Sequence, residues 1–162
     1  MHWVSSMKII DRKVLPELVG KLKAENKVIV FTNGCFDILH VGHVRYLQAA
    51  KQLGDLLVLG LNSDVSVKGF KGPTRPINGQ DDRAEVIAAM ESVDYIIVFD
   101  ELTAENLIEV VRPNIYVKGG DYVVDDLPEA KLVRRYGGEI VLIPEVQGRS
   151  STNMIKKIQE QH

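Results

Sequence analysis

The sequence predicts an α/β fold, a single doubly wound sheet of five parallel strands with helices on both faces. Two observations support this prediction. Short runs rich in Val, Ile and Leu alternate with helical patterns along the chain, and such continuous apolar runs are typical of parallel strands buried on both faces. Right-handed crossovers between these strands place the helices on both faces of one sheet.

The first half of the chain is predicted to hold two strands. A helix at roughly 14–25 precedes the run KVIVFT at 27–32, whose Val, Ile and Phe residues fit a strand buried on both faces. A helix is predicted at 43–54, because apolar residues recur about one turn apart and Gly54 stops it. The apolar run DLLVLGLN at 55–62 is the second strand.

The second half continues the alternation with three more strands. Acidic residues open the next helix, where they suit the positive end of its dipole. Pro113 separates a later helix from the strand that follows it. In order, the predicted elements are helix 80–92, strand 94–100, helix 103–112, strand 114–119, helix 127–138, strand 139–144 and helix 150–159.

Length and composition are those of an ordinary globular protein. The 162 residues suffice for one domain with a core of its own, and 45% are hydrophobic while 26% are charged. A net charge of −2 gives no indication of nucleic acid or an anionic membrane as a partner. Cys35 is the only cysteine, and no apolar run of membrane-spanning length occurs, so a cytoplasmic location is expected. Residues 1–7 are assigned to a tag or disordered terminus, and residues 8–162 to the domain.

The residues best suited to bind a ligand or to take part in a reaction lie in TNGCFDILHVGH, at the end of the first strand. Ligands of such sheets bind outside the carboxyl ends of the strands. Asn33 and Gly34 favour a tight turn with outward N–H groups, and Gly42 at the helix start leaves N–H groups free for an anion. His40 and His43 lie three residues apart, so both can project from the first helical turn and donate to phosphate oxygens, more strongly when protonated. The segment is predicted to be a phosphate clamp.

Two other interpretations of this segment stay open at this point. A histidine at a helix start is often only a cap or a packing residue. Cys35, Asp37, His40 and His43 are also possible zinc ligands, although zinc sites usually recruit ligands from separated segments, and no resident metal is expected.

The longest stretch predicted to be irregular is 62–79, NSDVSVKGFKGPTRPING. A basic loop of this length, rich in glycine and proline, is usually functional or mobile in a compact domain. Lys68, Lys71 and Arg75 could fold over a polyphosphate, and the alternative is a solvated basic loop. We expect the loop to be mobile without ligand and to close over phosphates.

Later segments add residues at the same edge of the sheet. In VKGGDY, Gly119 and Gly120 let a base or ribose approach the backbone, and Asp121 can accept from ribose hydroxyls; the alternative is a glycine turn with a capping Asp. In GRSSTN, Arg149 and the hydroxyls of residues 150–152 form a second anion site at a helix start.

Arg83, early in its helix, is expected either to reach a substrate phosphate or to form a surface ion pair.

These motifs resemble a known family. The segment GCFDILHVGHVRYL is similar to the signature of the HxGH nucleotidylyltransferases, and GRSSTNMI resembles their second motif. Together with NSD, KGPTRPIN, RAEVIAAMESVD and VKGGDY, the pattern resembles the D-glycero-β-D-manno-heptose 1-phosphate adenylyltransferases over residues 8–158. The resemblance implies a Rossmann-like, HUP-type nucleotidyltransferase fold.

The resemblance also implies a role for each matching residue. His40 and His43 would stabilise the β- and α-phosphates in the transition state, with Lys71 and Arg149 as the other catalytic residues. Arg75 and Arg83 are candidates for the substrate phosphate. The nucleotide pocket would comprise Thr32, Asn33, Gly34, Phe36, Asp37, Gly42, Lys68, Lys118, Gly119, Gly120, Asp121, Ser150, Ser151 and Thr152.

The implied reaction joins ATP and heptose 1-phosphate to give ADP-heptose and pyrophosphate for lipopolysaccharide-type surface glycans. Mg²⁺ would accompany ATP transiently, and the assembly would be a homodimer. The sequence leaves two alternatives open: a cytidylyltransferase for glycerol 3-phosphate or a related polyol phosphate, and a non-catalytic nucleotide-binding sensor.

Overall fold

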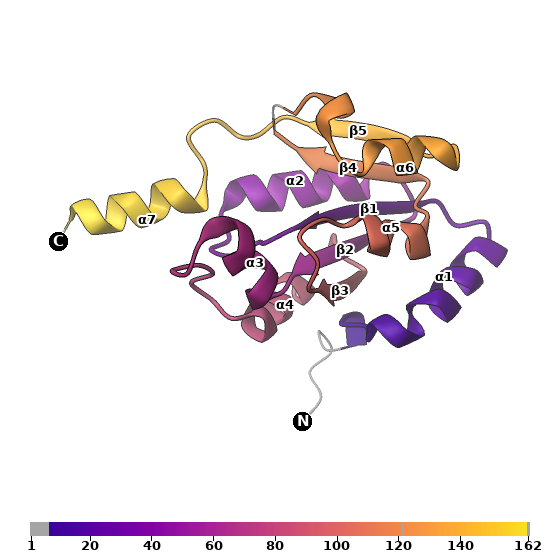
Figure 1. The fold of residues 1–162 in the computed structure, drawn as a ribbon, viewed down its shortest axis with the longest axis horizontal. Coiled ribbons are helices and arrows are strands. Elements are labelled where there is room, and N and C mark those ends of the chain that lie inside the picture. Colours follow the sequence, from indigo (N-terminus) through magenta and orange to yellow (C-terminus); the bar gives the residue numbers. More distant parts are fainter. Residues whose placement is uncertain (1–6, 121, 162) are drawn as a thin grey trace.

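The structure, a computed structural model, describes residues 7–120 and 122–161. Within them, a sheet of five parallel strands has the order β3–β2–β1–β4–β5 (Figure 1). The strands are β1 (Ile29–Gly34), β2 (Leu56–Asn62), β3 (Tyr95–Phe99), β4 (Ile115–Gly119) and β5 (Glu139–Ile143). The predicted doubly wound α/β fold is confirmed.

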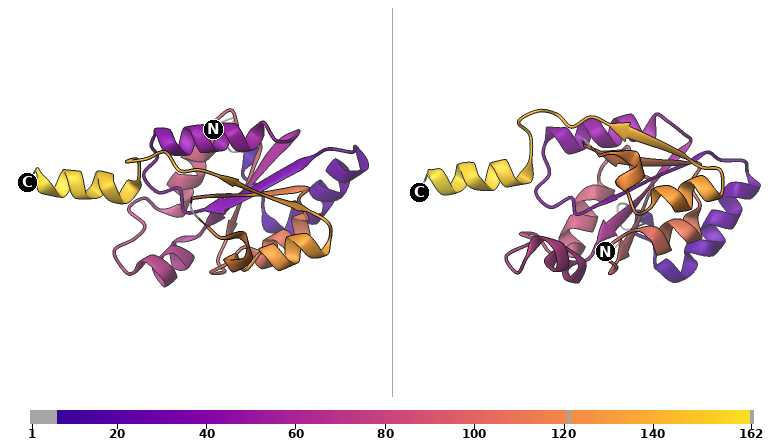
Figure 2. Two further views of the ribbon diagram at one scale, coloured as in Figure 1. Left: turned by 90° about the horizontal axis from the view of Figure 1, so that it is seen from above. Right: turned by 45° about the horizontal axis from the view of Figure 1, so that its top comes forward.

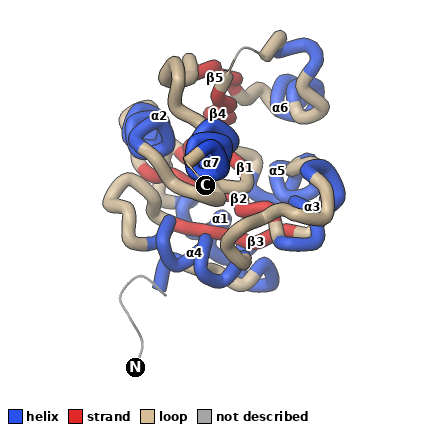
Figure 3. The backbone as a smooth tube through the Cα atoms, turned by 90° about the vertical axis from the view of Figure 1, so that its left-hand side faces the viewer, coloured by secondary structure: helices blue, strands red, loops and turns tan. Residues whose placement is uncertain are grey.

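Helices cover both faces of this sheet, as Figure 3 shows in a view along it. The α-helices are α1 (Leu15–Ala24), α2 (Val41–Lys51), α3 (Asp64–Lys71), α4 (Gln80–Ala88), α5 (Glu105–Val111), α6 (Ala130–Arg135) and α7 (Ser151–Glu160). Shorter 3-10 turns include η2 (Arg12–Val14) and η3 (Val124–Asp126). No helix in these two described ranges is both long and apolar enough to cross a membrane.

Alternate residues of the strands supply two separate cores. In β1, Phe31 packs with α1, α5 and α6 on one face, whereas Val30 packs with α2 and α4 on the other. This burial on both faces explains the continuous apolar runs of the central strands. Each face thereby fixes the helices whose starts border the carboxyl edge of the sheet.

Helix α3 corrects the prediction that 62–79 is irregular throughout. The Ser63 side chain accepts a hydrogen bond from the Ser66 backbone N–H at 3.2 Å and caps the helix, and Val67 is fully buried beneath it. The glycines and prolines of this stretch concealed the helix, because only the segment after Gly72 is irregular.

Helix α7 stands apart from the rest of the molecule. It projects away from the sheet in all three views of Figures 1 and 2, and none of its residues is buried. Its first turn nevertheless returns to the carboxyl edge of the sheet, where the Ser151 hydroxyl donates to the Ile38 carbonyl at 2.7 Å.

Candidate functional site

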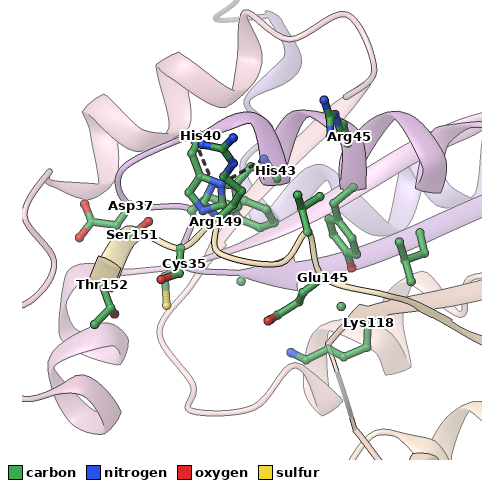
Figure 4. Close-up of a pocket in the computed structure, with 18 of the residues that line it drawn as sticks. Cys35, Asp37, His40, His43, Arg45, Lys118, Glu145, Arg149, Ser151 and Thr152 are labelled. Carbon is green, nitrogen blue, oxygen red and sulfur yellow. Dashed lines mark hydrogen bonds between the residues drawn. The ribbon is translucent and has the colours of Figure 1, made fainter. Parts of the chain in front are cut away.

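A cavity of about 510 Å³ lies at the carboxyl edge of the sheet, beside the ends of β1, β4 and β5. Between β1 and β4 the strand order reverses, because the chain passes from β1 to β2 on one side and β4 joins on the other. Such a switch point is the usual ligand site of a doubly wound sheet. In Figure 4, Asp37 and Lys118 lie at opposite ends of the cavity, with His40, His43 and Arg149 between them.

The two histidines are held by a reciprocal capping box at the start of α2. The His40 Nδ1 accepts from the Gly42 backbone N–H at 3.1 Å, and the His43 Nδ1 accepts from the His40 backbone N–H at 3.3 Å. Helix α2 therefore begins two residues earlier than predicted, with His40 as its N-cap. The capping interpretation thus describes the local structure, and the same bonds aim both rings at the cavity (Figure 4).

These cap bonds determine which ring nitrogen carries the proton. A nitrogen that accepts a hydrogen bond is unprotonated, so each neutral imidazole carries its proton on Nε2. The ring centroids lie 4.0 Å apart. The pair therefore presents two neighbouring Nε2–H donors, which suits adjacent oxygens of a phosphate chain.

Both histidines are neutral at pH 7 in this arrangement. The pKa of His43 is lowered from 6.5 to about 4, chiefly by burial and also by the neighbouring His40 and Lys71. Burial and the Arg149 charge lower the pKa of His40, while Glu145 opposes the shift. At neutral pH the two rings therefore donate as neutral Nε2–H groups, without the added strength that protonation would give.

Gly42 and Gly34 are required for steric reasons. A Cβ on Gly42 would lie 2.8 Å from the His40 ring, and one on Gly34 would lie 2.9 Å from the Phe36 ring. The Gly42 N–H is occupied by His40 and is not free for an anion as predicted. Gly34 belongs to β1 with Asn33, so the predicted tight turn at these two residues is wrong.

Phe36 makes the turn that follows β1. It adopts φ 47°, a left-handed conformation that side-chain-bearing residues rarely use. The centroid of its ring lies 5.5 Å from that of His43, so this turn places the Phe36 ring against the His43 imidazole.

Tyr46, which the sequence analysis did not single out, lines the cavity and joins β1 to β4. Its hydroxyl lies 2.6 Å from the Thr32 Oγ1 and donates to the Val117 carbonyl at 3.2 Å. Its ring lies 3.2 Å from the position of a Cβ on Gly119, so Gly119 admits the ring. Thr32 is fully buried and acts through Tyr46, not as part of the cavity wall.

The β4 end of the cavity combines a cation and a carboxylate. Burial lowers the pKa of Lys118, which lines the cavity together with Glu145. Gly120, just outside the cavity wall, has φ 96°, and a Cβ there would lie 3.1 Å from the Glu145 carboxylate. Asp121 lies outside the described residues. Glu145 was also missed by sequence analysis; its signal is a lone acid directly after the last strand.

The start of α7 closes the other side of the cavity. Arg149, Ser150, Ser151 and Thr152 all line it. Ser150 caps α7 by accepting from the Asn153 N–H at 3.0 Å. The predicted gathering of these four residues at a helix start is therefore present.

Of the two lysines on α3, Lys71 lines the cavity and Lys68 does not. Asp37 also lines it, yet its carboxylate is already engaged, accepting from the Ile77 N–H at 2.7 Å and the Asn78 N–H at 2.9 Å. The Arg75 Nε lies 3.5 Å from the same carboxylate, but Arg75 does not line the cavity.

Arg83 requires a correction. Its side chain is fully buried, so it neither reaches into the cavity nor forms a surface ion pair. It donates to the carbonyls of Cys35, Asn62 and Asn78 and to the Asp64 carboxylate.

The zinc interpretation finds no support in the described ranges, where no group of three or more His, Cys, Asp and Glu side chains is arranged to hold a metal ion. Asp37 is engaged elsewhere, and the two histidines use Nδ1 for capping.

The comparisons with known proteins identify the family of the chain. The family described as cytidylyltransferase-like matches residues 31–158, which include the histidine segment and the α7 motif. The bifunctional protein HldE of Geobacter sulfurreducens is 52% identical over 157 residues, 97% of this chain and 32% of that protein. The HldE of Aliarcobacter butzleri is 52% identical over 146 residues, 90% of this chain and 30% of that protein. The chain thus spans about a third of the length of these relatives.

Two solved structures share the fold. A lipopolysaccharide core biosynthesis protein from Thermoplasma volcanium superposes with a TM-score of 0.60 and 29% identity, covering 76% of this chain and 99% of that one. Pantothenate synthetase from Thermus thermophilus gives a TM-score of 0.58 at 18% identity, covering 95% of this chain and 70% of that one, a likeness of fold alone.

Proposed function

Because the chain belongs to the cytidylyltransferase-like family, we propose that it is a nucleotidylyltransferase that transfers AMP from ATP to D-glycero-β-D-manno-heptose 1-phosphate. The products would be ADP-heptose and pyrophosphate, for lipopolysaccharide-type glycans. The observation that carries the proposal is the pair of Nε2–H donors between Lys71 and Arg149 in one cavity. Relatives named HldE and a lipopolysaccharide core biosynthesis protein support the choice of sugar.

The geometry suits a direct in-line transfer. A phosphate oxygen of the sugar attacks the α-phosphorus of ATP, and the bond from that phosphorus to the bridging oxygen of the β-phosphate breaks. Pyrophosphate leaves with the bonding electrons. No protein nucleophile is needed, so the protein's contribution is positioning and stabilisation of charge. The two imidazoles donate to the α- and β-phosphates, and Lys71 and Arg149 balance the negative charge that moves onto the leaving group.

The two ends of the cavity fit different substrates. Lys118, Gly119 and Glu145 form the end that would take the base and ribose. Asp37 and Thr152 lie toward the other end, where the sugar phosphate would enter. In-line attack requires that acceptor and pyrophosphate lie on opposite sides of the α-phosphorus, and a cavity with two ends and a central donor pair allows this.

We also propose Mg²⁺ as the companion of the triphosphate. The ion usually binds through phosphates, waters and one or two carboxylates, not through a full protein cage. The cavity fits this mode, because its lining offers the carboxylates of Asp37 and Glu145 at opposite ends and no three-ligand cluster occurs in the described ranges, so phosphate and water oxygens would be the main ligands. When bound with ATP, Mg²⁺ would neutralise phosphate charge.

A homodimer and a cytoplasmic location complete the proposal. The exposed apolar side of α7 supports self-association. The use of ATP and the free thiol of Cys35 suit a reducing compartment.

Pyrophosphate release with each nucleoside triphosphate and a panel of sugar and polyol phosphates tests the function. We expect turnover with ATP and the heptose 1-phosphate. Turnover with CTP and glycerol 3-phosphate would instead support the cytidylyltransferase alternative. Nucleotide binding without pyrophosphate release from any pair would support the sensor.

A further inference from the structure

We propose that Arg83 and Asp37 are positioning residues that hold the segment 72–79 against the histidine loop, and thereby set the acceptor side of the reaction. The expected kinetic effect rests on the proposed function. The hydrogen bonds from Arg83 and Asp37 that hold residues 77 and 78, called the tether below, do not depend on that function.

The first support is the environment of Arg83, on the first turn of α4. Its side chain has no exposed surface, and burying a guanidinium is costly unless its donors are engaged. Nη1 donates to the Cys35 carbonyl at 2.7 Å and to the Asn62 carbonyl at 2.8 Å. Nε donates to the Asn78 carbonyl at 2.9 Å, and Nη2 donates to the Asp64 carboxylate at 2.9 Å.

These four acceptors come from three segments: the loop after β1, the junction of β2 and α3, and the segment after α3. Cys35 lies in the loop that leads to His40, Asn62 ends β2, Asp64 starts α3, and Asn78 lies in the segment after α3. A planar guanidinium with donors in fixed directions can join four such groups, whereas the ammonium of lysine cannot reach them all. Arg83 therefore fixes the histidine loop relative to α3 and 72–79.

Asp37 provides a second link between the same two segments. Its carboxylate accepts from the backbone N–H groups of Ile77 and Asn78, across forty residues of chain. Asn78 is thus held at its carbonyl by Arg83 and at its N–H by Asp37. This double attachment holds the end of the 72–79 segment against Asp37, which itself lines the cavity.

Arg75 is the charged residue that the held segment 72–79 carries toward Asp37. Its Nε and Nη2 are buried and have no hydrogen-bond partner among the described residues. Unsatisfied buried guanidinium donors are unfavourable, and Asp37 offers only the 3.5 Å contact to Nε. Arg75 is thus a cation held beside Asp37, which lies at the acceptor end of the cavity. Displacing residues 72–79 would move Arg75 and Asp37. The acceptor phosphate would then be misplaced, while the end of the cavity that takes the base would stay unchanged.

The kinetic test compares Arg83→Lys with Arg12→Lys as a matched control, because Arg12 pairs with Glu101 in an ion pair that shares no residue with the cavity. With the acceptor that supports turnover, we expect kcat/KM for the acceptor to fall about 10–10²-fold in Arg83→Lys, the size of a misplacement of about 1 Å. The Kd for ATP is expected to stay within threefold, and Arg12→Lys is expected to leave both constants unchanged. Free guanidinium is expected to restore part of the acceptor kcat/KM in Arg83→Ala.

A second variant guards against loss of folding. Asp64→Ala leaves the three carbonyl contacts of Arg83 in place, so it is expected to fold and to lower acceptor kcat/KM several-fold. The positioning role is overturned if a folded Arg83→Lys or Asp64→Ala keeps wild-type acceptor kcat/KM. It is also overturned if ATP affinity falls in parallel, which would indicate a general structural role.

Hydrogen exchange tests the tether without any substrate. The amides of Ile77 and Asn78 are expected to be protected in the wild-type protein and to lose protection in Asp37→Asn and Arg83→Lys, while β1 keeps its protection. Unprotected amides in the wild-type protein would refute the tether even if pyrophosphate release confirmed the enzyme. Protected amides in a protein without pyrophosphate release would refute the proposed function and keep the tether.

Discussion

His40 illustrates how one side chain serves both local structure and chemistry. As an N-cap it uses Nδ1 to satisfy the Gly42 N–H, and this bond directs the proton to Nε2, where it faces the cavity. The ordinary N-cap residues, Ser, Asp and Asn, would satisfy the helix equally well. The choice of histidine at this cap is therefore best explained by the donor that it presents.

Substitution at His40 separates the two roles. His40→Ala removes the cap and the donor, while His40→Asn keeps a good cap. Both are expected to lower kcat about 10²–10³-fold, as when one donor is removed from a preorganised anion site, with little change in the Kd for ATP. Only His40→Ala is expected to lose about 1 kcal/mol of unfolding free energy. Turnover near wild type in His40→Asn would show that capping is the residue's whole role.

The pKa of His43 predicts a dependence of stability on pH. The folded-state pKa of about 4 lies below the ordinary value of 6.5, so between these values the unfolded chain binds a proton that the folded protein does not. The free energy of unfolding therefore falls as pH falls from 6.5 toward 4. Denaturant unfolding at pH 7 and pH 5 is expected to show a smaller difference in His43→Gln than in the wild type. An identical difference in both would mean that His43 titrates normally.

At the scale of single elements, prediction succeeded where a periodic pattern or a strong apolar run existed. The five strands and most helices follow from such patterns. Helix α3 was missed because Gly69 and the prolines after it dominate the local composition, while its stability comes from the Ser63 cap and from burial of Val67 against β2. The predicted start of α2 was two residues late, because histidine is not among the residues that usually cap a helix.

The existence of α3 makes a prediction about its two lysines. They lie three residues apart on the last turns of the helix, but only Lys71 lines the cavity. Lys71→Ala is expected to lower kcat/KM for ATP by about 10–10²-fold, the value of a hydrogen bond to a charged group. Lys68→Ala removes the same charge nearby and serves as the control, with an expected change under threefold. An equal fall in kcat/KM in both variants would mean that only the overall positive charge of α3 matters.

At the scale of the whole molecule, the fold and the edge that carries the site could be predicted from sequence, and the site's internal contacts could not. The order of apolar runs fixes a doubly wound sheet, and that sheet fixes where a ligand binds. Nothing in the sequence reveals that Arg83 is buried or that Asp37 accepts from Ile77 and Asn78, because these contacts join segments 40 or more residues apart. Tyr46 was missed for the same reason, because its bond to the Val117 carbonyl spans 71 residues.

Helix α7 leads to the last prediction, which concerns assembly. Ten residues form a helix that is marginal alone in water, and α7 exposes 37% of Met154 and 56% of Ile158 on one side. Its first turn lines the cavity, so a second copy that covers this side would also hold residues 149–152 in place. Light scattering is expected to give a dimer for the wild type and a monomer for Met154→Glu/Ile158→Glu, with kcat/KM for ATP reduced about tenfold or more by the misplaced cavity wall. Lys156→Glu introduces an acid on the opposite side of the helix and is expected to stay dimeric and active. A wild-type monomer at micromolar concentration, or a fully active monomeric double variant, would show that α7 holds its place without a partner.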